Sequence, residues 1–181
     1  MADINASTLS SRLSPADSQA GPEGPAYDLI ELLFFAYRDF IGDADEILSR
    51  IGFGRAHHRV LHFVHRHPGM RVADLLDVLK ITKQSLGRVL RELVDNGYVV
   101  QRAGPADRRQ RLLYTTAKGE ALSLELALLQ TRRFARALNE CGEGARAEAS
   151  RFLVAMIEPS ARDKVEALIA RADQRTKSRP R

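Results

Sequence analysis

Residues 81–119 read ITKQSLGRVLRELVDNGYVVQRAGPADRRQRLLYTTAKG, and this stretch decides the fold. Thr82 is a good helix N-cap, and the apolar residues after it recur at helical spacing until Gly97, which favours the left-handed conformation that ends helices. Strand-forming residues at 98–102 and 111–115 flank a polar stretch that contains glycine and proline. The stretch therefore predicts a helix followed by a β-hairpin with a long polar tip.

Two further short helices are predicted upstream, over residues 55–66 and 72–79. His67-Pro68-Gly69 separates them, because the residue before proline disfavours the helical conformation and glycine permits a turn. Two short helices joined by a tight turn at residues 80–81, followed by a hairpin, form a winged helix-turn-helix. We therefore expect residues 52–116 to form such a domain, in a chain that is mainly α with a small β-hairpin wing.

Helical segments are predicted on both sides of this domain, over residues 26–51 and 117–173, with a dent or break expected at Gly42. Residues 1–24 are polar and rich in Ser, Ala and Pro, so we expect a disordered tail. Residues 174–181 are expected to be a frayed basic tail. The helices predicted within the second segment are 117–141, with Thr116 as its N-cap, 145–158 and 161–173.

Composition narrows the functional class. The formal net charge of +5 favours a polyanionic partner. Cys141 is the single cysteine, and neither a signal-peptide pattern nor an apolar run long enough to cross a bilayer occurs, so we expect a cytoplasmic protein with no membrane partner. No phosphate-cradling glycine loop or nucleophile–base set is found, so we expect neither an enzyme nor a cofactor.

The second helix of the predicted motif carries polar and cationic residues on its exposed face. Glutamine can bond adenine through two hydrogen bonds, and arginine or lysine can bond guanine. The free N–H groups of the helix N-terminus can also bind a phosphate. The residues that we expect to contact DNA from this helix are Thr82, Lys83, Gln84, Ser85, Arg88 and Arg91.

The predicted hairpin tip is rich in arginine. A narrow minor groove has enhanced negative potential and attracts arginine side chains. Asp107 lies two residues before Arg109, so on an extended strand the two side chains would share a face and the carboxylate could hold the guanidinium. The wing residues that we expect at the DNA are Asp107, Arg108, Arg109 and Arg111.

Residues 52–119 resemble the multiple-antibiotic-resistance-regulator (MarR) family. The matching motifs are ITKQSL at 81–86, LVDNGYV at 93–99, and Asp107-Arg108-Arg109 followed by TAKG at 116–119. The sequence departs from the family at Thr115, where leucine is usual. It also has Gly87 inside the recognition helix, where glycine costs about 1 kcal/mol in helix propensity against alanine.

The resemblance implies a transcriptional regulator that binds a pseudo-palindromic site on double-stranded DNA. It implies a homodimer in which residues 26–51 and 117–173 of both chains interlock as N- and C-terminal dimerisation helices. It places Arg109 in the minor groove with Asp107 as its partner. The residues that it places in the major groove are Lys83, Gln84, Ser85 and Arg88.

The resemblance also implies a small aromatic or anionic effector, bound where the dimerisation helices meet the DNA-binding domain. Residues that combine aromatic faces with cationic or titratable groups are the candidates. These are Phe34, Tyr37, Arg38, Phe53, His57 and His58.

Three alternatives stay open at this point. All five histidines fall within residues 57–67, which suggests a metal sensor, but neighbouring arginines repel a cation and residues 55–69 hold no Asp or Glu, so a structural or effector role is preferred over a metal site. Cys141 is expected to be an inert thiol rather than a redox sensor, because it lies near a helix C-terminus. Finally, some winged helices bind protein or RNA instead of DNA.

Overall fold

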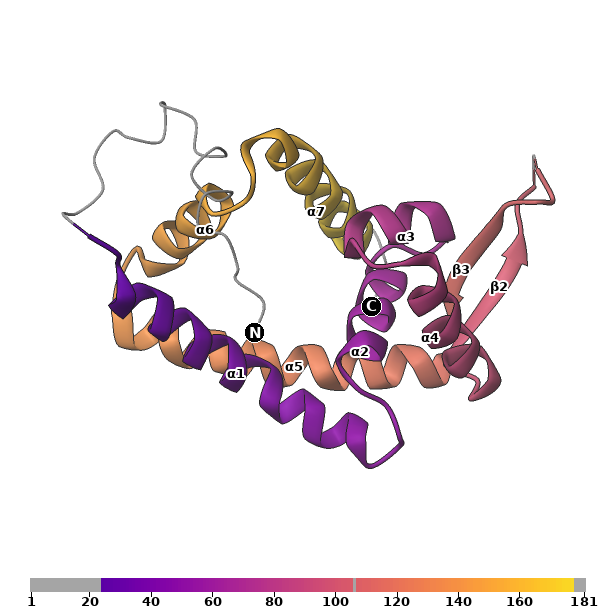
Figure 1. The fold of residues 1–181 in the computed structure, drawn as a ribbon, viewed down its shortest axis with the longest axis horizontal. Helices are drawn as coiled ribbons and strands as arrows, with labels where there is room; N and C mark the ends of the chain where they lie inside the picture. The colour runs from indigo at the N-terminus through magenta and orange to yellow at the C-terminus, as the bar shows by residue number, and fades with distance from the viewer. Residues whose placement is uncertain (1–23, 106, 178–181) are drawn as a thin grey trace, which may run out of the picture. The chain divides into compact units, whose positions relative to one another are not determined.

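The computed structural model describes residues 24–105 and 107–177, and the chain divides into two compact units, residues 1–38 and 39–181. The predicted tail at residues 1–23 and the end of the basic tail at 178–181 lie outside the described residues. Within the described ranges, no helix has both the length and the apolar character needed to cross a bilayer. The elements in chain order (Figure 1) are α1 (Tyr27–Ser49), α2 (Arg55–Arg66), β1 (Met70–Arg71), α3 (Val72–Leu79), α4 (Lys83–Asp95), β2 (Val99–Ala103), β3 (Arg111–Thr115), α5 (Ala117–Cys141), α6 (Ala145–Ala155), a 3₁₀ turn (Pro159–Ala161) and α7 (Arg162–Lys177).

The first unit contains the N-terminal half of α1, and this half carries a run of exposed apolar side chains. Within it, the Arg38 guanidinium lies 5.0 Å from the centre of the Phe35 ring. Helix α1 continues without a break through Gly42, where a dent or break was predicted. The exposed apolar side chains of this half are Tyr27, Leu29, Ile30, Leu32, Leu33, Phe34, Phe35 and Tyr37.

The second unit is built around an aliphatic core that joins α2, α3, α4, the sheet and the first turns of α5. The apolar residues that recur along α4, Leu86, Val89, Leu90 and Leu93, are buried, which confirms their helical spacing. Lys80 adopts the left-handed conformation at φ 51°, which gives the tight turn between α3 and α4. The largest fully buried side chains among the described residues are Leu48, Leu61, Leu75, Leu86, Leu93, Leu113, Leu126, Val60, Val64 and Val99.

The sheet of the described chain is three-stranded and antiparallel, in the order β1-β3-β2, so the expectation of a simple two-stranded hairpin was incomplete. Strands β2 and β3 pair from Val99 opposite Thr115 to Ala103 opposite Arg111. Strand β1 forms because Gly69, at φ 82°, turns the chain alongside β3 and its N–H donates to the Leu113 carbonyl at 2.8 Å. Two residues are too few to show a strand periodicity in a sequence.

Helix α5 is joined tightly to the turn before the wing. The Thr116 hydroxyl oxygen accepts from the Gly119 N–H at 3.1 Å, which confirms the predicted N-cap. A Cβ added at Gly119 would lie 2.0 Å from the Tyr98 carbonyl oxygen, so only glycine fits there without a shift of the backbone. The TAKG sequence therefore fixes where α5 leaves the wing.

The C-terminal helix α7 extends further than predicted and packs on the winged domain (Figure 1). It runs to Lys177, so the part of the expected basic tail at 174–177 is helical. Arg66 of α2 bonds both Asp173 and, at 3.0 Å, the Thr176 hydroxyl. Ala172 between them is buried. One flanking helix thus contacts the winged domain of its own chain.

Candidate nucleic-acid interface

The exposed face of α4 carries the polar and cationic residues singled out in the sequence. Thr82 caps the helix as predicted, because its Oγ1 accepts from the Ser85 N–H at 3.1 Å. The Thr82 hydroxyl also donates to Ser85 Oγ at 2.9 Å, so both of these side chains take part in the cap. The first-turn N–H groups of such a helix point outward and favour a phosphate. The exposed residues of α4 and its cap are Thr82, Lys83, Gln84, Ser85, Gly87, Arg88, Arg91 and Asp95.

Arg88 is held by a residue that the sequence analysis did not select. Its Nε donates to Glu92 Oε1 at 3.1 Å, and Glu92 Oε2 lies 2.6 Å from His57 Nε2 on α2. Hydrogen bonds from Arg88 and then from His57 lower the pKa of the Glu92 carboxyl below its usual value. The spacing of four residues between Arg88 and Glu92 was the available signal in the sequence.

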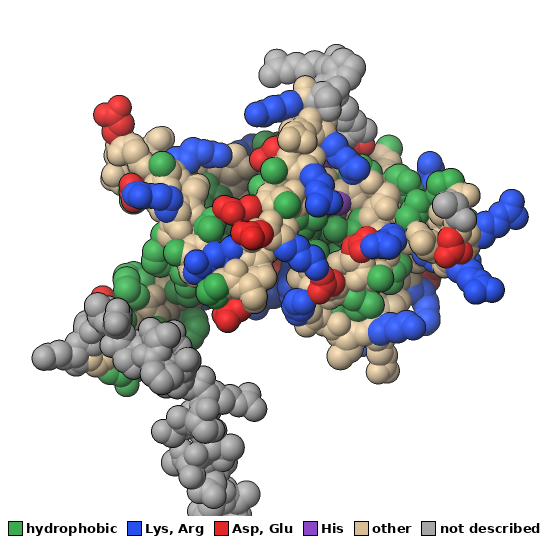
Figure 2. All heavy atoms as spheres, turned by 90° about the horizontal axis from the view of Figure 1, so that it is seen from above, with side chains coloured by type: hydrophobic (Ala, Val, Ile, Leu, Met, Phe, Trp, Pro, Cys, Tyr) green, Lys and Arg blue, Asp and Glu red, His purple; other side chains and the backbone are tan. Residues whose placement is uncertain are grey.

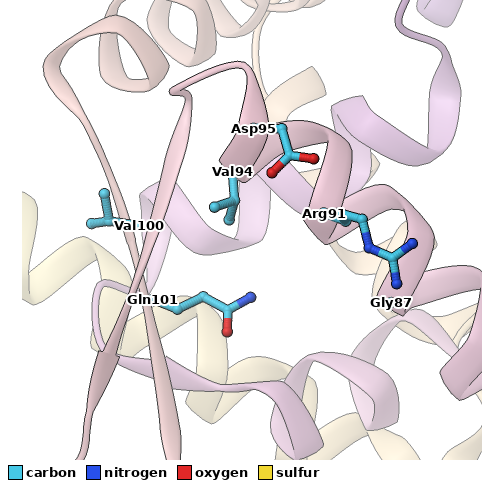
Figure 3. Close-up of a pocket in the computed structure, with 6 residues that line it drawn as sticks. All are labelled: Gly87, Arg91, Val94, Asp95, Val100 and Gln101. Atoms are coloured by element: carbon cyan, nitrogen blue, oxygen red, sulfur yellow. The ribbon is translucent and has the colours of Figure 1, made fainter.

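A hollow of about 520 Å³ lies between α4 and β2 (Figure 3). Gly87, Arg91, Val94 and Asp95 line it from the helix, and the Gln101 side chain reaches toward it from the strand. A Cβ added at Gly87 would meet no atom within 4 Å, so packing does not require glycine at this position. Its surroundings are open at the face where DNA would approach.

The wing tip is folded by backbone hydrogen bonds, and Asp107 acts differently from the prediction. Gly104 N–H donates to the Gln110 carbonyl, and Gln110 N–H donates to the Asp107 carbonyl, both at 3.0 Å. Asp107 Oδ1 accepts from the backbone N–H of Arg109 at 2.9 Å. Residues 107–109 lie in a turn and not on an extended strand, so the carboxylate holds the backbone of Arg109 in place of the expected guanidinium.

Cationic side chains gather around the wing (Figure 2). Arg108, Arg109 and Arg111 are exposed. Arg102 instead lies over the Tyr114 ring, 4.9 Å from its centre, on the body of the hairpin. Helix α4 and the wing belong to the same winged domain and are joined by the turn at Gly97. The φ of Gly97 is 72°, as predicted for a helix C-terminus. Both cationic surfaces are therefore carried by one packed body.

The candidate effector residues divide between the two units. Phe34, Tyr37 and Arg38 belong to the first unit, whereas Phe53, His57 and His58 belong to the second. In the second unit the Phe53 and His57 rings stack at 4.4 Å between centres. His57 bonds Gly54 N–H through Nδ1 and Glu92 through Nε2, so both of its ring nitrogens have internal partners. This pattern favours a structural role for His57.

The surroundings lower the pKa of three other histidines, His58, His62 and His67. The pKa of His62 is lowered to about 4, first by burial and then by His58, Arg66 and the neighbouring histidines. Burial also lowers the pKa of His58, against an opposing effect of Asp45. In the ranges that the structure describes, no three His, Cys, Asp or Glu side chains are grouped to hold a metal ion. Cys141 is an exposed free thiol.

Comparison with known proteins agrees with this architecture. A sequence model described as the MarR family matches residues 51–110. The HTH-type transcriptional regulator PetP of Rhodobacter capsulatus is 47% identical over 133 residues, covering 74% of this chain and 80% of PetP.

Several solved structures have the same fold. A crystal structure of MarR has a TM-score of 0.61 at 23% identity, covering 82% of this chain and 99% of MarR. Streptococcus pneumoniae FabT in complex with DNA has a TM-score of 0.65 at 15% identity, covering 73% and 94% of the two chains. The Mycobacterium tuberculosis MarR family protein Rv2887, in complex with p-aminosalicylic acid, has a TM-score of 0.52 at 25% identity, covering 72% and 96%.

Proposed function

From the premise that this chain belongs to the MarR family of DNA-binding transcriptional regulators, we propose that it is a homodimer that reads a pseudo-palindromic operator under the control of a small effector. The observation that carries the proposal is the pairing, in one lobe, of a cationic recognition-helix face with an arginine-rich wing. Helix α4 enters a major groove and the wing enters the flanking minor groove. Two-fold symmetry then sets the half-sites about one helical turn, ~10 bp, apart.

The roles of individual residues follow from their chemistry. Lys83, Gln84 and Arg88 reach base edges, while Ser85 and the amides of the first turn of α4 bind phosphate. Arg109 enters the minor groove on a backbone that the Asp107 carboxylate fixes. The remaining cations, Arg91, Arg108 and Arg111, neutralise phosphates, so affinity falls steeply with salt.

The dimer is supported by apolar surface that a monomer would leave in water. The first unit exposes the apolar run of α1, and the second unit exposes apolar side chains of α5, α6 and α7. Clusters of exposed apolar side chains mark interaction sites in soluble proteins. A hollow of about 460 Å³ between α5 and α6, lined mainly by apolar atoms, adds to this surface. The exposed apolar residues of α5, α6, the segment after α6 and α7 are Leu124, Leu128, Phe134, Phe152, Leu153, Met156 and Ile169.

The effector class is an aromatic carboxylate. Rv2887, at 25% identity, was solved with p-aminosalicylic acid and with salicylic acid. Within the second unit, Phe53 and His58 offer an aromatic face and a titratable ring to such a ligand. Titration calorimetry with salicylate, followed by release of a labelled DNA duplex, tests this part of the proposal separately.

Selection of bound sites from a random duplex pool tests the proposed function as a whole. The expected result is a palindromic consensus, bound in fluorescence anisotropy far more tightly than a scrambled duplex. Sedimentation should give a dimer, and Phe152→Glu should shift it toward monomer with a loss of operator affinity, whereas the charge change Glu158→Gln should not. A pool that yields no enriched sequence contradicts the DNA-reading role and favours a winged helix that docks protein.

A further inference from the structure

We propose that Glu92 is a positioning residue that sets the base discrimination of the recognition helix by holding Arg88, and that His57 anchors it. This inference rests on the proposed function and assigns a role to two residues outside the expected set of DNA contacts. Three groups form the chain: Arg88 Nε bonds Glu92 Oε1 at 3.1 Å, and Glu92 Oε2 lies 2.6 Å from His57 Nε2.

The His57 end of the chain is fixed. The Gly54 N–H donates to His57 Nδ1 at 3.2 Å, so Nδ1 is the acceptor and Nε2 is the ring nitrogen that donates. The Nε2–H donates to the Glu92 carboxylate at 2.6 Å. The residue is 9% exposed, and its ring stacks on Phe53 at an interplanar angle of 5°. Glu92 is thus bonded to a rigid part of the lobe.

The bond to His57 distinguishes the Arg88–Glu92 pair from ordinary surface ion pairs. Exposed pairs four residues apart on a helix contribute little, since both long side chains remain mobile. Glu46 and Arg50 form such a pair, and the Glu46 side chain is 70% exposed. The Glu92 side chain is 38% exposed and is held through both oxygens. Its orientation is therefore determined by the fold.

The consequence for Arg88 is a defined guanidinium orientation. The Nε bond uses one of the five N–H donors and sets the plane of the group, while the outer Nη edge of this 83% exposed side chain stays toward solvent. An Nη edge presented in a fixed plane suits the O6 and N7 acceptors of guanine. A mobile arginine would instead contact whichever phosphate is nearest.

The Glu92 charge acts in the same direction. A carboxylate on a DNA-facing helix repels phosphates, which weakens binding to every sequence. Where Arg88 bonds both O6 and N7 of a guanine, these hydrogen bonds offset the repulsion between Glu92 and the phosphates. At other sequences the repulsion is not offset. The pair thus raises the ratio of operator to non-operator affinity more than it raises affinity itself.

Three variants measured against the selected operator and a scrambled duplex test the inference. Glu92→Gln keeps the shape but removes the charge, and Glu92→Asp keeps the charge but shortens the reach. Both are expected to lower the operator-to-scrambled affinity ratio about tenfold, the discrimination that one well-placed bidentate contact gives. Glu46→Gln is the matched control, because it makes the same charge change in an exposed Glu–Arg pair, and it should leave the ratio unchanged.

The double variant completes the cycle. Arg88→Ala should lower the ratio, and adding Glu92→Gln to it should lower it no further, because the two residues act through one contact. A purely structural role for Glu92 would lower the melting temperature while both affinities change by the same factor, and that result overturns the inference. A wild-type ratio for Glu92→Asp overturns it as well. If the wild-type protein selects no operator, the proposed function fails first.

Discussion

The Thr116 hydroxyl donates to the Gly97 carbonyl at 2.7 Å, so one side chain joins the turn after α4 to the first turn of α5. The same oxygen accepts from the Gly119 N–H at 3.1 Å. The end of the recognition helix and the start of the long flanking helix therefore share a hydrogen-bonded joint.

Loss of this joint should destabilise the fold. Thr116→Val keeps the volume but removes the cap and the bond to Gly97, and we expect a loss of about 1–2 kcal/mol in the free energy of unfolding. Urea denaturation measures it. Thr131→Val is the control, because that hydroxyl only bonds a carbonyl one turn back on α5, and it should change stability by less than about half as much.

Replacing either of two helix glycines by alanine should change the stability of the fold, in opposite directions for the two positions. Gly119→Ala places a Cβ against the Tyr98 carbonyl, and the backbone must move, so we expect a loss of more than about 2 kcal/mol. Gly87→Ala meets open space, so helix propensity should raise stability by up to about 1 kcal/mol. Thermal unfolding of both variants measures these changes. Equal effects would mean that the close approach of Gly119 to Tyr98 is absent in solution.

Removal of the Arg109 side chain from the wing should weaken DNA binding without affecting the fold. Arg109→Ala is expected to lower operator affinity and to reduce the slope of log affinity against log salt by about 1. Anisotropy titrations at several salt concentrations measure both. Asp107→Ala should have a smaller effect of the same sign, since the carboxylate orders only the Arg109 backbone. An unchanged slope for Arg109→Ala would remove this residue from the interface.

Acid should destabilise the protein through His62. Its pKa is lowered to about 4 in the folded state from an ordinary value of 6.5, so between these values the unfolded chain binds more protons. The contribution of His62 to the free energy of unfolding is complete above about pH 6.5. It declines as the pH falls toward 4, by on the order of 2 kcal/mol. Unfolding curves from pH 7 to 4.5 measure the slope. His62→Gln should flatten it, although His58 and His67, whose pKa values are also lowered, will preserve part of it.

Local rules in the sequence predicted much of the fold. Apolar spacing gave the bounds of α2, α3 and α5 as observed, and Thr82 and Thr116 cap their helices as expected. Periodicity could not show β1, which is too short and forms through its pairing with β3. Helix ends past Pro159 were also misplaced, because packing of α7 on α2 extends that helix.

The candidate interface was predictable in part. Cations on α4 and on the wing follow from residue type and position in the motif. The bond from His57 to Glu92 spans 35 positions in the chain, and no spacing rule relates residues so far apart. The Asp107 interaction was misjudged for a different reason, since a strand was assumed where the chain turns and the backbone competes for the carboxylate.

The attachment of α7 to Arg66 has a consequence for synthesis of the protein in the cell. Arg66 and Asp173 are separated by 107 positions in the chain. The ribosome has therefore made the entire winged domain long before helix α7 emerges. The winged domain can assemble from early, mostly local contacts, and α7 packs on α2 only after residues 162–177 have been made. A stalled or prematurely terminated chain would therefore leave that patch of α2 open to chaperones and proteases, even with its recognition helix already folded.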